Sequence, residues 1–162
     1  MTSRPDPVAP ADAAARALAR ELIDAARFAA LSVIDPNDGL PGISRIAFGR
    51  TAGGGFLTLI SALAPHFAAL QAQPGCALML GEVGEKGDPL THPRLMIKAR
   101  AQFVAGDDPA RPALRAHWLD HHPKARLYVD FADFAFVRLI PVSALLNGGF
   151  ARAFRLEPSD MG

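Results

Sequence analysis

The sequence is poor in cysteine: it holds one, Cys76, among 162 residues. A single cysteine excludes an intrachain disulfide and favours a reducing compartment. A structural zinc site needs four ligands, and His117, His121 and His122 have no further Cys or His motif to complete one. We therefore predict no metal site.

The chain also lacks an excess of either charge and any long apolar run. It has 17 Lys and Arg against 16 Asp and Glu, for a formal net charge of +1, which argues against a nucleic-acid partner. No stretch approaches the roughly 18 apolar residues of a membrane-spanning helix. Residues 1–10 contain three prolines and no signal-peptide core, so we expect a disordered arm and a cytoplasmic protein.

Several catalytic motifs are missing as well. No serine lies in a G-x-S-x-G motif, and no G-x-x-x-x-G-K-[ST] motif occurs. Gly53–Gly55 precedes a strand-like run, whereas a phosphate-binding loop precedes a helix. These absences argue against a serine hydrolase and against nucleotide-triphosphate chemistry.

Glycine and proline, with 14 of each, divide the chain into short elements. Helix signals predict helices over 11–26, 65–72 and 107–122. Alternating or continuous apolar runs predict strands over 28–34, 42–48, 56–60, 76–80, 95–104, 136–140 and 141–146. We expect one domain over 11–162 in the α+β class, mainly β: an antiparallel barrel of six or seven strands with flanking helices.

The segment after Asn147 combines a glycine pair with an aromatic residue and a cation. If the chain is extended beyond Gly149, Phe150 and Arg152 point to the same side, which suits a flat ligand with an anionic tail. The alternative is a strand with a bulge and one solvated arginine.

Other cations lie on or beside predicted strands. Ser44 and Arg45 are adjacent, Lys98 lies on the basic side of the 95–104 strand, and Ser61 comes just before a helix. A helix N-terminus with a hydroxyl and a converging arginine can bind an anion. Strand alternation places Ser44 and Arg45 on opposite faces, so one ligand reaches both only at a strand end or a subunit seam. Taken singly, each cation also fits a solvated surface charge.

Residues 16–156 resemble a known family through the combination of several segments. These are 25–32 with the 35–39 turn, 44–47, 59–61 with His66 and Leu70, 87–95, 122–131 and 148–153. The sequence resembles the pyridoxamine 5′-phosphate oxidase-related, FMN-binding split-barrel proteins, and within them the haem-utilisation (HugZ-like) branch.

The resemblance implies a split-barrel homodimer with FMN in a groove at the subunit interface. It implies that Ser44 and Arg45 lie at the phosphate, that Ile60 and Ser61 lie along the flavin, and that Arg152 lies near the phosphate or the ring edge. The chain departs from the family pattern at residues 67–69, where two possible phosphate ligands are replaced by Phe and Ala.

Three functions follow as hypotheses. The first is a flavin-dependent oxidoreductase, with Arg152, Lys98 or His66 as the cation near the flavin ring. The second is a haem-binding or haem-utilisation protein, which needs an axial ligand such as His66 or His92. The third is a non-catalytic dimer that binds flavin or serves only as an interaction module.

Overall fold

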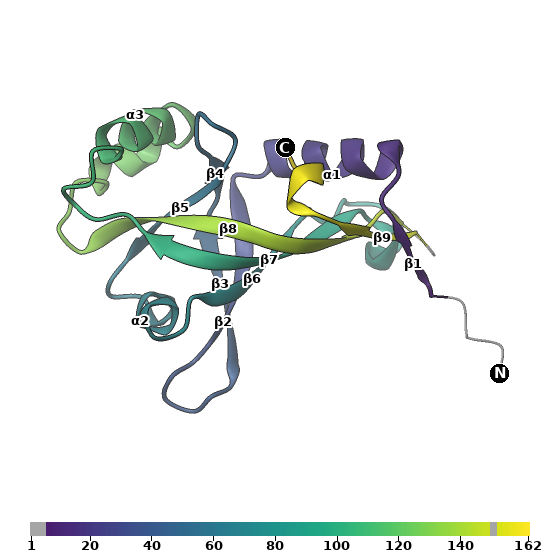
Figure 1. Cartoon of the computed structure of the whole chain (residues 1–162), viewed down its shortest axis with the longest axis horizontal. Helices are drawn as coiled ribbons and strands as arrows, with labels where there is room; N and C mark the ends of the chain where they lie inside the picture. Colours follow the sequence, from purple (N-terminus) through teal and green to yellow (C-terminus); the bar gives the residue numbers. More distant parts are fainter. Residues whose placement is uncertain (1–5, 150–151) are drawn as a thin grey trace.

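The structure, a computed structural model, describes residues 6–149 and 152–162. Within these ranges, one sheet of nine strands carries three α-helices (Figure 1). The helices are α1 (Ala13–Ala25), α2 (Pro65–Ala72) and α3 (Arg111–His121). The strands are β1 (Val8–Pro10), β2 (Phe28–Ile34), β3 (Pro41–Ala47), β4 (Gly49–Arg50), β5 (Phe56–Ser61), β6 (Gly75–Leu80), β7 (Arg94–Phe103), β8 (Phe134–Asn147) and β9 (Ala153–Leu156).

The strands run in the order β1-β9-β8-β7-β6-β2-β3, and β5 pairs with the first half of β8 and with β4. The sheet therefore curls until β3 lies against β5, although no ladder joins these two strands in the part of the chain that the structure describes. This is the predicted α+β barrel with flanking helices. The predicted strand number was too low, and the purely antiparallel arrangement was wrong because β1 pairs with β9 in parallel.

Strand β8 is continuous across Pro141, where the sequence indicated two separate strands. The β7–β8 register shifts at this point, because Lys98 pairs with Ser143 and Ala99 pairs with Pro141. Val142 is left as the extra residue of a bulge. A sheet tolerates proline, which has no backbone N–H, at such a bulge, and here the proline is the neighbouring Pro141.

The disordered arm predicted over residues 1–10 is too long. Residues 1–5 lie outside the described ranges, but Val8–Pro10 form β1 against Ala153–Arg155. Arg155 strengthens this pairing with an ion pair to Asp6 at 2.8 Å. The partner strand is distant in sequence, so local composition could not reveal it.

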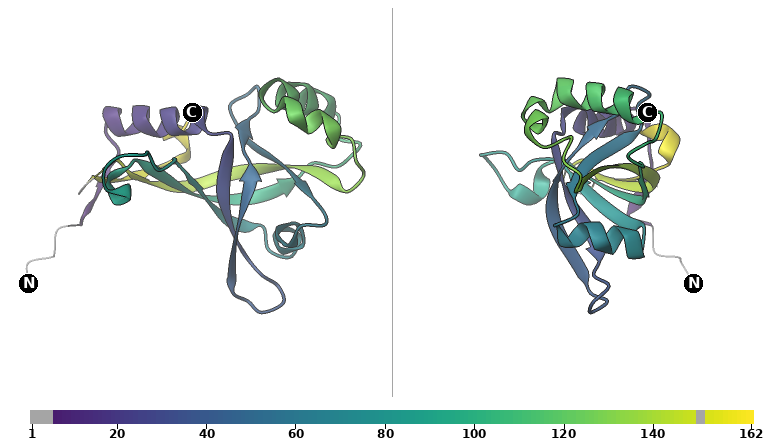
Figure 2. Two further views of the ribbon diagram at one scale, coloured as in Figure 1. Left: turned by 180° about the vertical axis from the view of Figure 1, so that it is seen from behind. Right: turned by 90° about the vertical axis from the view of Figure 1, so that its left-hand side faces the viewer.

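Helices α1 and α3 lie on one side of the long strands β7 and β8, and α2 lies on the other side with the β2–β3 hairpin (Figures 1 and 2). The Asp12 carboxylate caps α1 by accepting a hydrogen bond from the Ala15 N–H at 2.7 Å. Ala15, Ala19 and Ile23 then bury one stripe of α1 in the main core.

A second core lies under α3. Trp118, Leu114 and Leu119 of this helix pack on Leu57 and Phe136 of the sheet. Strand β5 is thus buried on both faces, since Phe56 and Ile60 belong to the main core and Leu57 to the second. Among the described residues, no helix is long and apolar enough to cross a membrane.

Candidate functional site

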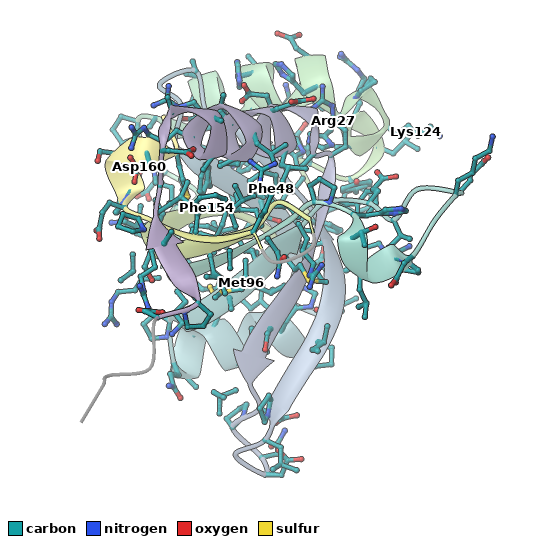
Figure 3. All side chains as sticks on the ribbon, turned by 90° about the vertical axis from the view of Figure 1, so that its right-hand side faces the viewer. Arg27, Phe48, Met96, Lys124, Phe154 and Asp160 are labelled. Carbon is teal, nitrogen blue, oxygen red and sulfur yellow. The ribbon has the colours of Figure 1, made fainter. Side chains whose placement is uncertain are left out.

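Helix α2 packs into the main core through Ala69 and Leu70, so one face of the sheet is not covered by any α-helix of the described ranges. We call it the outer sheet face: the side of β2, β3, β6, β7 and β8 that is turned away from the main core. Met79 pairs with Met96, and Lys98 lies between Ala77 and Ser143 on this face. Figure 3 shows Met96 on the opposite side of the sheet from the buried Phe48.

The outer sheet face holds a cavity of about 620 Å³, which we call the basic cavity. Lys98 and Arg100, exposed and two residues apart on β7, supply its cations. Ile34 and Val142 give it apolar surface, and Ser32 adds a hydroxyl. The cavity can therefore hold a flat apolar group with anionic substituents. Sequence alternation predicted the basic face of β7, but only the pairing with β2 and β6 shows the cavity.

Cys76 also lines the basic cavity. Burial raises the pKa of its thiol to about 11, and the thiol donates a long hydrogen bond of 3.6 Å to the Ala99 carbonyl. The thiol is therefore neutral at pH 7, which makes it a poor nucleophile and a poor metal ligand.

A second cavity of about 150 Å³ lies between β3 and α2, and we call it the helix cavity. Here the structure brings together two of the predicted site residues, because Ser44 Oγ lies 2.9 Å from His66 Nδ1. Burial lowers the pKa of His66, so its imidazole is neutral at pH 7. Sequence reasoning listed both residues but missed their contact, because they come from different elements.

Arg45 points away from the helix cavity. It follows Ser44 on β3, and its guanidinium lies over the ring of Phe28 at 5.3 Å. Strand alternation thus separates Ser44 from Arg45, as the sequence predicted. One ligand cannot contact both side chains on the same face of a single chain.

Ile60 and Ser61 end β5. The Ile60 side chain is 3% exposed and belongs to the main core, so within one chain only its backbone can meet a ligand. The Ser61 hydroxyl donates to Asp133 Oδ2 at 2.7 Å and accepts the Leu63 N–H at 3.1 Å. A phosphate at Ser61 would have to compete with the Asp133 carboxylate.

Arg152 lies exposed in the turn between β8 and β9. Its carbonyl accepts a hydrogen bond from Gly148 at 2.8 Å, and Gly149 has the positive φ of 128° that favours glycine. Phe150, which we predicted to share a face with Arg152, lies outside the described residues. Arg152 is not part of the lining of the basic cavity or of the helix cavity.

His92, a predicted candidate for an iron ligand, holds the loop over residues 81–93. Its Nδ1 accepts the Gly84 N–H at 2.7 Å, and its Nε2–H donates to the Lys86 carbonyl at 2.8 Å. An amide N–H can only donate and a carbonyl can only accept, so the tautomer is determined. Both ring nitrogens are engaged, and His92 could ligate iron only if this loop opened.

Comparisons with known proteins agree with this fold. No family model matches the chain. A curated relative, the non-canonical heme oxygenase HOZ of the Arabidopsis thaliana chloroplast, is 33% identical over 117 residues, which cover 72% of this chain and 35% of that protein. The chain thus spans about a third of this relative's length.

Solved structures superpose over most of the chain. One is 45% identical with a TM-score of 0.83, and it covers 94% of this chain and 97% of its own. The heme binding protein from Mycobacterium smegmatis is 23% identical with a TM-score of 0.78, covering 99% of this chain and 61% of its own.

A pyridoxinephosphate oxidase family protein from Clostridium acetobutylicum, related to general stress protein 26, shares the fold at 12% identity. Its TM-score is 0.71, and the match covers 94% of this chain and 100% of that protein. From the split-barrel fold and the sequence relative together, the chain belongs to the pyridoxamine 5′-phosphate oxidase-like split-barrel family, in its haem-utilisation (HugZ-like) branch.

Proposed function

We propose that this protein binds haem in the basic cavity, at the seam of a homodimer formed by the outer sheet face. The observation that carries this proposal is the pair Lys98 and Arg100 on the rim of a 620 Å³ cavity with an apolar floor. The similarity to a heme oxygenase at 33% identity supports the same ligand.

The charge and the apolar surface of the cavity fit the haem ring and its carboxylates, while an axial iron ligand would have to come from outside this lining. Haem is a flat apolar ring that carries two carboxylates on one edge, and two cations on one strand face can pair with them. Lys98 and Arg100 lie two residues apart on the same face of β7, so both can reach one edge of the ring. Ile34 and Val142 offer apolar contact to the ring. When bound, the iron would supply the redox chemistry, and these side chains would bind and orient the ring.

A second copy of the chain would complete the site. The outer sheet face exposes large apolar side chains, among them Ile43 (78% exposed), Met79 (49%), Val142 (48%) and Ile140 (47%). Apolar side chains gathered on one open sheet face are typical of an interaction surface. A partner seated there would cover the basic cavity and exclude water from it.

Haemin titration of the purified protein tests the proposal. We expect a Soret band that shifts on binding, and an affinity roughly tenfold weaker after Lys98→Gln combined with Arg100→Gln. Lys124→Gln, an exposed charge outside the cavity, is the matched control. An unchanged haemin spectrum, or equal affinity in the double variant, would contradict the proposal.

FMN is the second candidate ligand, and one observation favours it. None of the residues that line the basic cavity in the described ranges is a histidine, and a flavin needs no iron ligand. Lys98 and Arg100 would then pair with the FMN phosphate, and the protein would be a flavin-dependent oxidoreductase or a flavin-binding dimer. Quenching of FMN fluorescence on addition of the protein would indicate flavin binding and not haem binding. Bleaching of the bound flavin by a reduced nicotinamide would then indicate the oxidoreductase.

A further inference from the structure

A third cavity, of about 240 Å³, lies where the C-terminal ends of α1 and α3 meet β4. We call it the histidine cavity, and its polar lining is Asp24, Arg27, Arg50, His117, His121 and His122. Figure 3 labels Arg27 just beyond the end of α1, and the cavity lining brings it together with His121 and His122 at the end of α3. None of these residues belongs to the basic cavity or to the helix cavity.

The one carboxylate of this lining is already neutralised. Asp24 Oδ1 accepts a hydrogen bond from Arg50 Nε at 2.7 Å. The other arms of Arg50 donate to the carbonyls of Gly54 at 2.8 Å and Met161 at 2.9 Å. Asp24 and Arg50 therefore cancel in charge, and Arg50 is held in place by backbone groups at both sides.

Arg27 is different, because much of its guanidinium is unused. Its Nη1 donates to the carbonyls of Asp24 at 2.9 Å and Ala26 at 3.2 Å. Its Nε and Nη2 make no hydrogen bond among the described residues. A guanidinium held on one side by carbonyls keeps donors on the other side for an anion.

The histidines are oriented by backbone carbonyls. His122 Nε2–H donates to the Phe48 carbonyl at 3.0 Å, and the ring stacks on Trp118 with centroids 4.0 Å apart. His121 Nδ1–H donates to the His117 carbonyl at 2.9 Å. Each of these rings can offer a second N–H only when it is protonated, and it is then an imidazolium.

A metal ion does not fit this cavity as well as an anion does. No group of three or more His, Cys, Asp or Glu side chains in the described ranges is arranged to hold a metal. Arg27 carries a permanent charge beside the rings and repels a divalent cation. The same charge attracts an anion.

We infer that the histidine cavity binds the phosphate group of a small phosphate monoester, with Arg27 as the permanent donor and His122 as a donor that is protonated on binding. The volume of about 240 Å³ holds a phosphate group and leaves room for a short substituent. A phosphate presents several acceptor oxygens, which the guanidinium and the imidazolium N–H groups can share.

This arrangement links phosphate binding to pH. Burial lowers the pKa of His122, and the positive charges of Arg27 and His121 lower it further, against the opposing effect of the Phe48 carbonyl. A phosphate in the cavity offsets the repulsion from Arg27 and His121, so it raises the pKa of His122 and binding takes up protons. Of the other facing charges, Asp24 and Arg50 stay paired with each other and do not change this sign.

Calorimetric titration with inorganic phosphate and with glycerol 3-phosphate, at constant ionic strength with chloride as the counter-ion, tests the inference. We expect binding to be roughly tenfold tighter near about pH 6 than near about pH 8, with proton uptake measured from buffers of different ionisation enthalpy. Tighter binding of glycerol 3-phosphate identifies a monoester as the ligand, and equal binding identifies free phosphate. Absence of binding, or equal affinity at both pH values, overturns the inference.

Variants assign the effect to this cavity. Arg27→Gln should weaken phosphate binding roughly tenfold, and His122→Gln should flatten the pH dependence without removing the guanidinium. Arg126→Gln removes an exposed charge outside the cavity and should bind like the parent. If Arg27→Gln binds phosphate as tightly as the parent, the inference is wrong.

Discussion

The two sides of the sheet differ in how far a single chain completes them. Helices α1 and α3 cover one side, where Trp118, Phe136 and Leu57 are at most 1% exposed. The outer sheet face keeps Met79 and Val142 about half exposed, although both lie on well-formed strands. The helix-covered side is therefore a finished core, and the outer sheet face is the surface for which we propose a partner. Variants on each side of the sheet test this difference.

The largest effect is expected on the helix-covered side. Trp118→Ala should lower the free energy of unfolding by about 3–5 kcal/mol, because it empties the second core. Trp118→Phe should cost much less, since the indole Nε1 is buried without a hydrogen-bond partner among the described residues and its loss removes no bond. Urea denaturation measures both. A Trp118→Phe variant as unstable as Trp118→Ala would indicate a partner for the indole.

Cys76 probes how well water reaches the basic cavity. Its pKa, raised by burial to about 11, predicts alkylation roughly 100-fold slower than in the unfolded chain near about pH 8. Because the folded pKa is raised, the thiol should lower stability only as pH rises from about 9 towards about 11. Iodoacetamide kinetics with and without urea measure the ratio, and equal rates would show that the thiol is open to solvent.

A charge on the outer sheet face tests whether the face is an interface. Met79→Asp should weaken self-association by roughly tenfold or more, because it buries a carboxylate in the seam, while the isolated chain stays folded. Light scattering after size exclusion gives the mass. Glu82→Gln, an exposed change in the loop after β6, is the control. If both variants have the parent's mass at all concentrations, the outer sheet face does not mediate self-association.

The smallest effect is expected in the helix cavity. Ser44→Ala removes the hydrogen bond to His66 and should cost about 1 kcal/mol of stability. Because the pKa of His66 is already lowered by burial, the loss should be the same at neutral pH and at moderately higher pH, where the ring stays neutral. Urea denaturation at two pH values checks this, and a loss confined to acidic pH would mean that Ser44 bonds the imidazolium.

The sequence predicted most elements, and its failures have physical causes. Strand 28–34 and helix 65–72 match the structure because their patterns are local: alternation for the strand, and Pro65 with a helical composition for the helix. Strand β1 was missed because its stability depends on β9 at the far end of the chain. Pro141 signalled a break, yet a bulge accommodates it inside β8.

In the candidate site, too, local patterns predicted some features and missed others. Alternation along a strand put Lys98 and Arg100 on one face and separated Ser44 from Arg45, and the structure shows both. The contact between Ser44 and His66, and the bond between Ser61 and Asp133, join segments that no local pattern connects. That the Ser61 hydroxyl is hydrogen-bonded to Asp133 follows from the fold of the chain and not from the residue type.

The sequence by itself determined the barrel class, the basic face of β7 and the resemblance to split-barrel proteins, because periodicity and turn residues act over a few neighbouring positions. The tertiary structure alone decided which polar groups meet. It joined α1, β4 and α3 around the histidine cavity, paired Asp24 with Arg50, and left one face of the sheet without a covering helix. Contacts between segments far apart in the chain depend on the packing of the whole domain, and a single sequence carries no local signal for them.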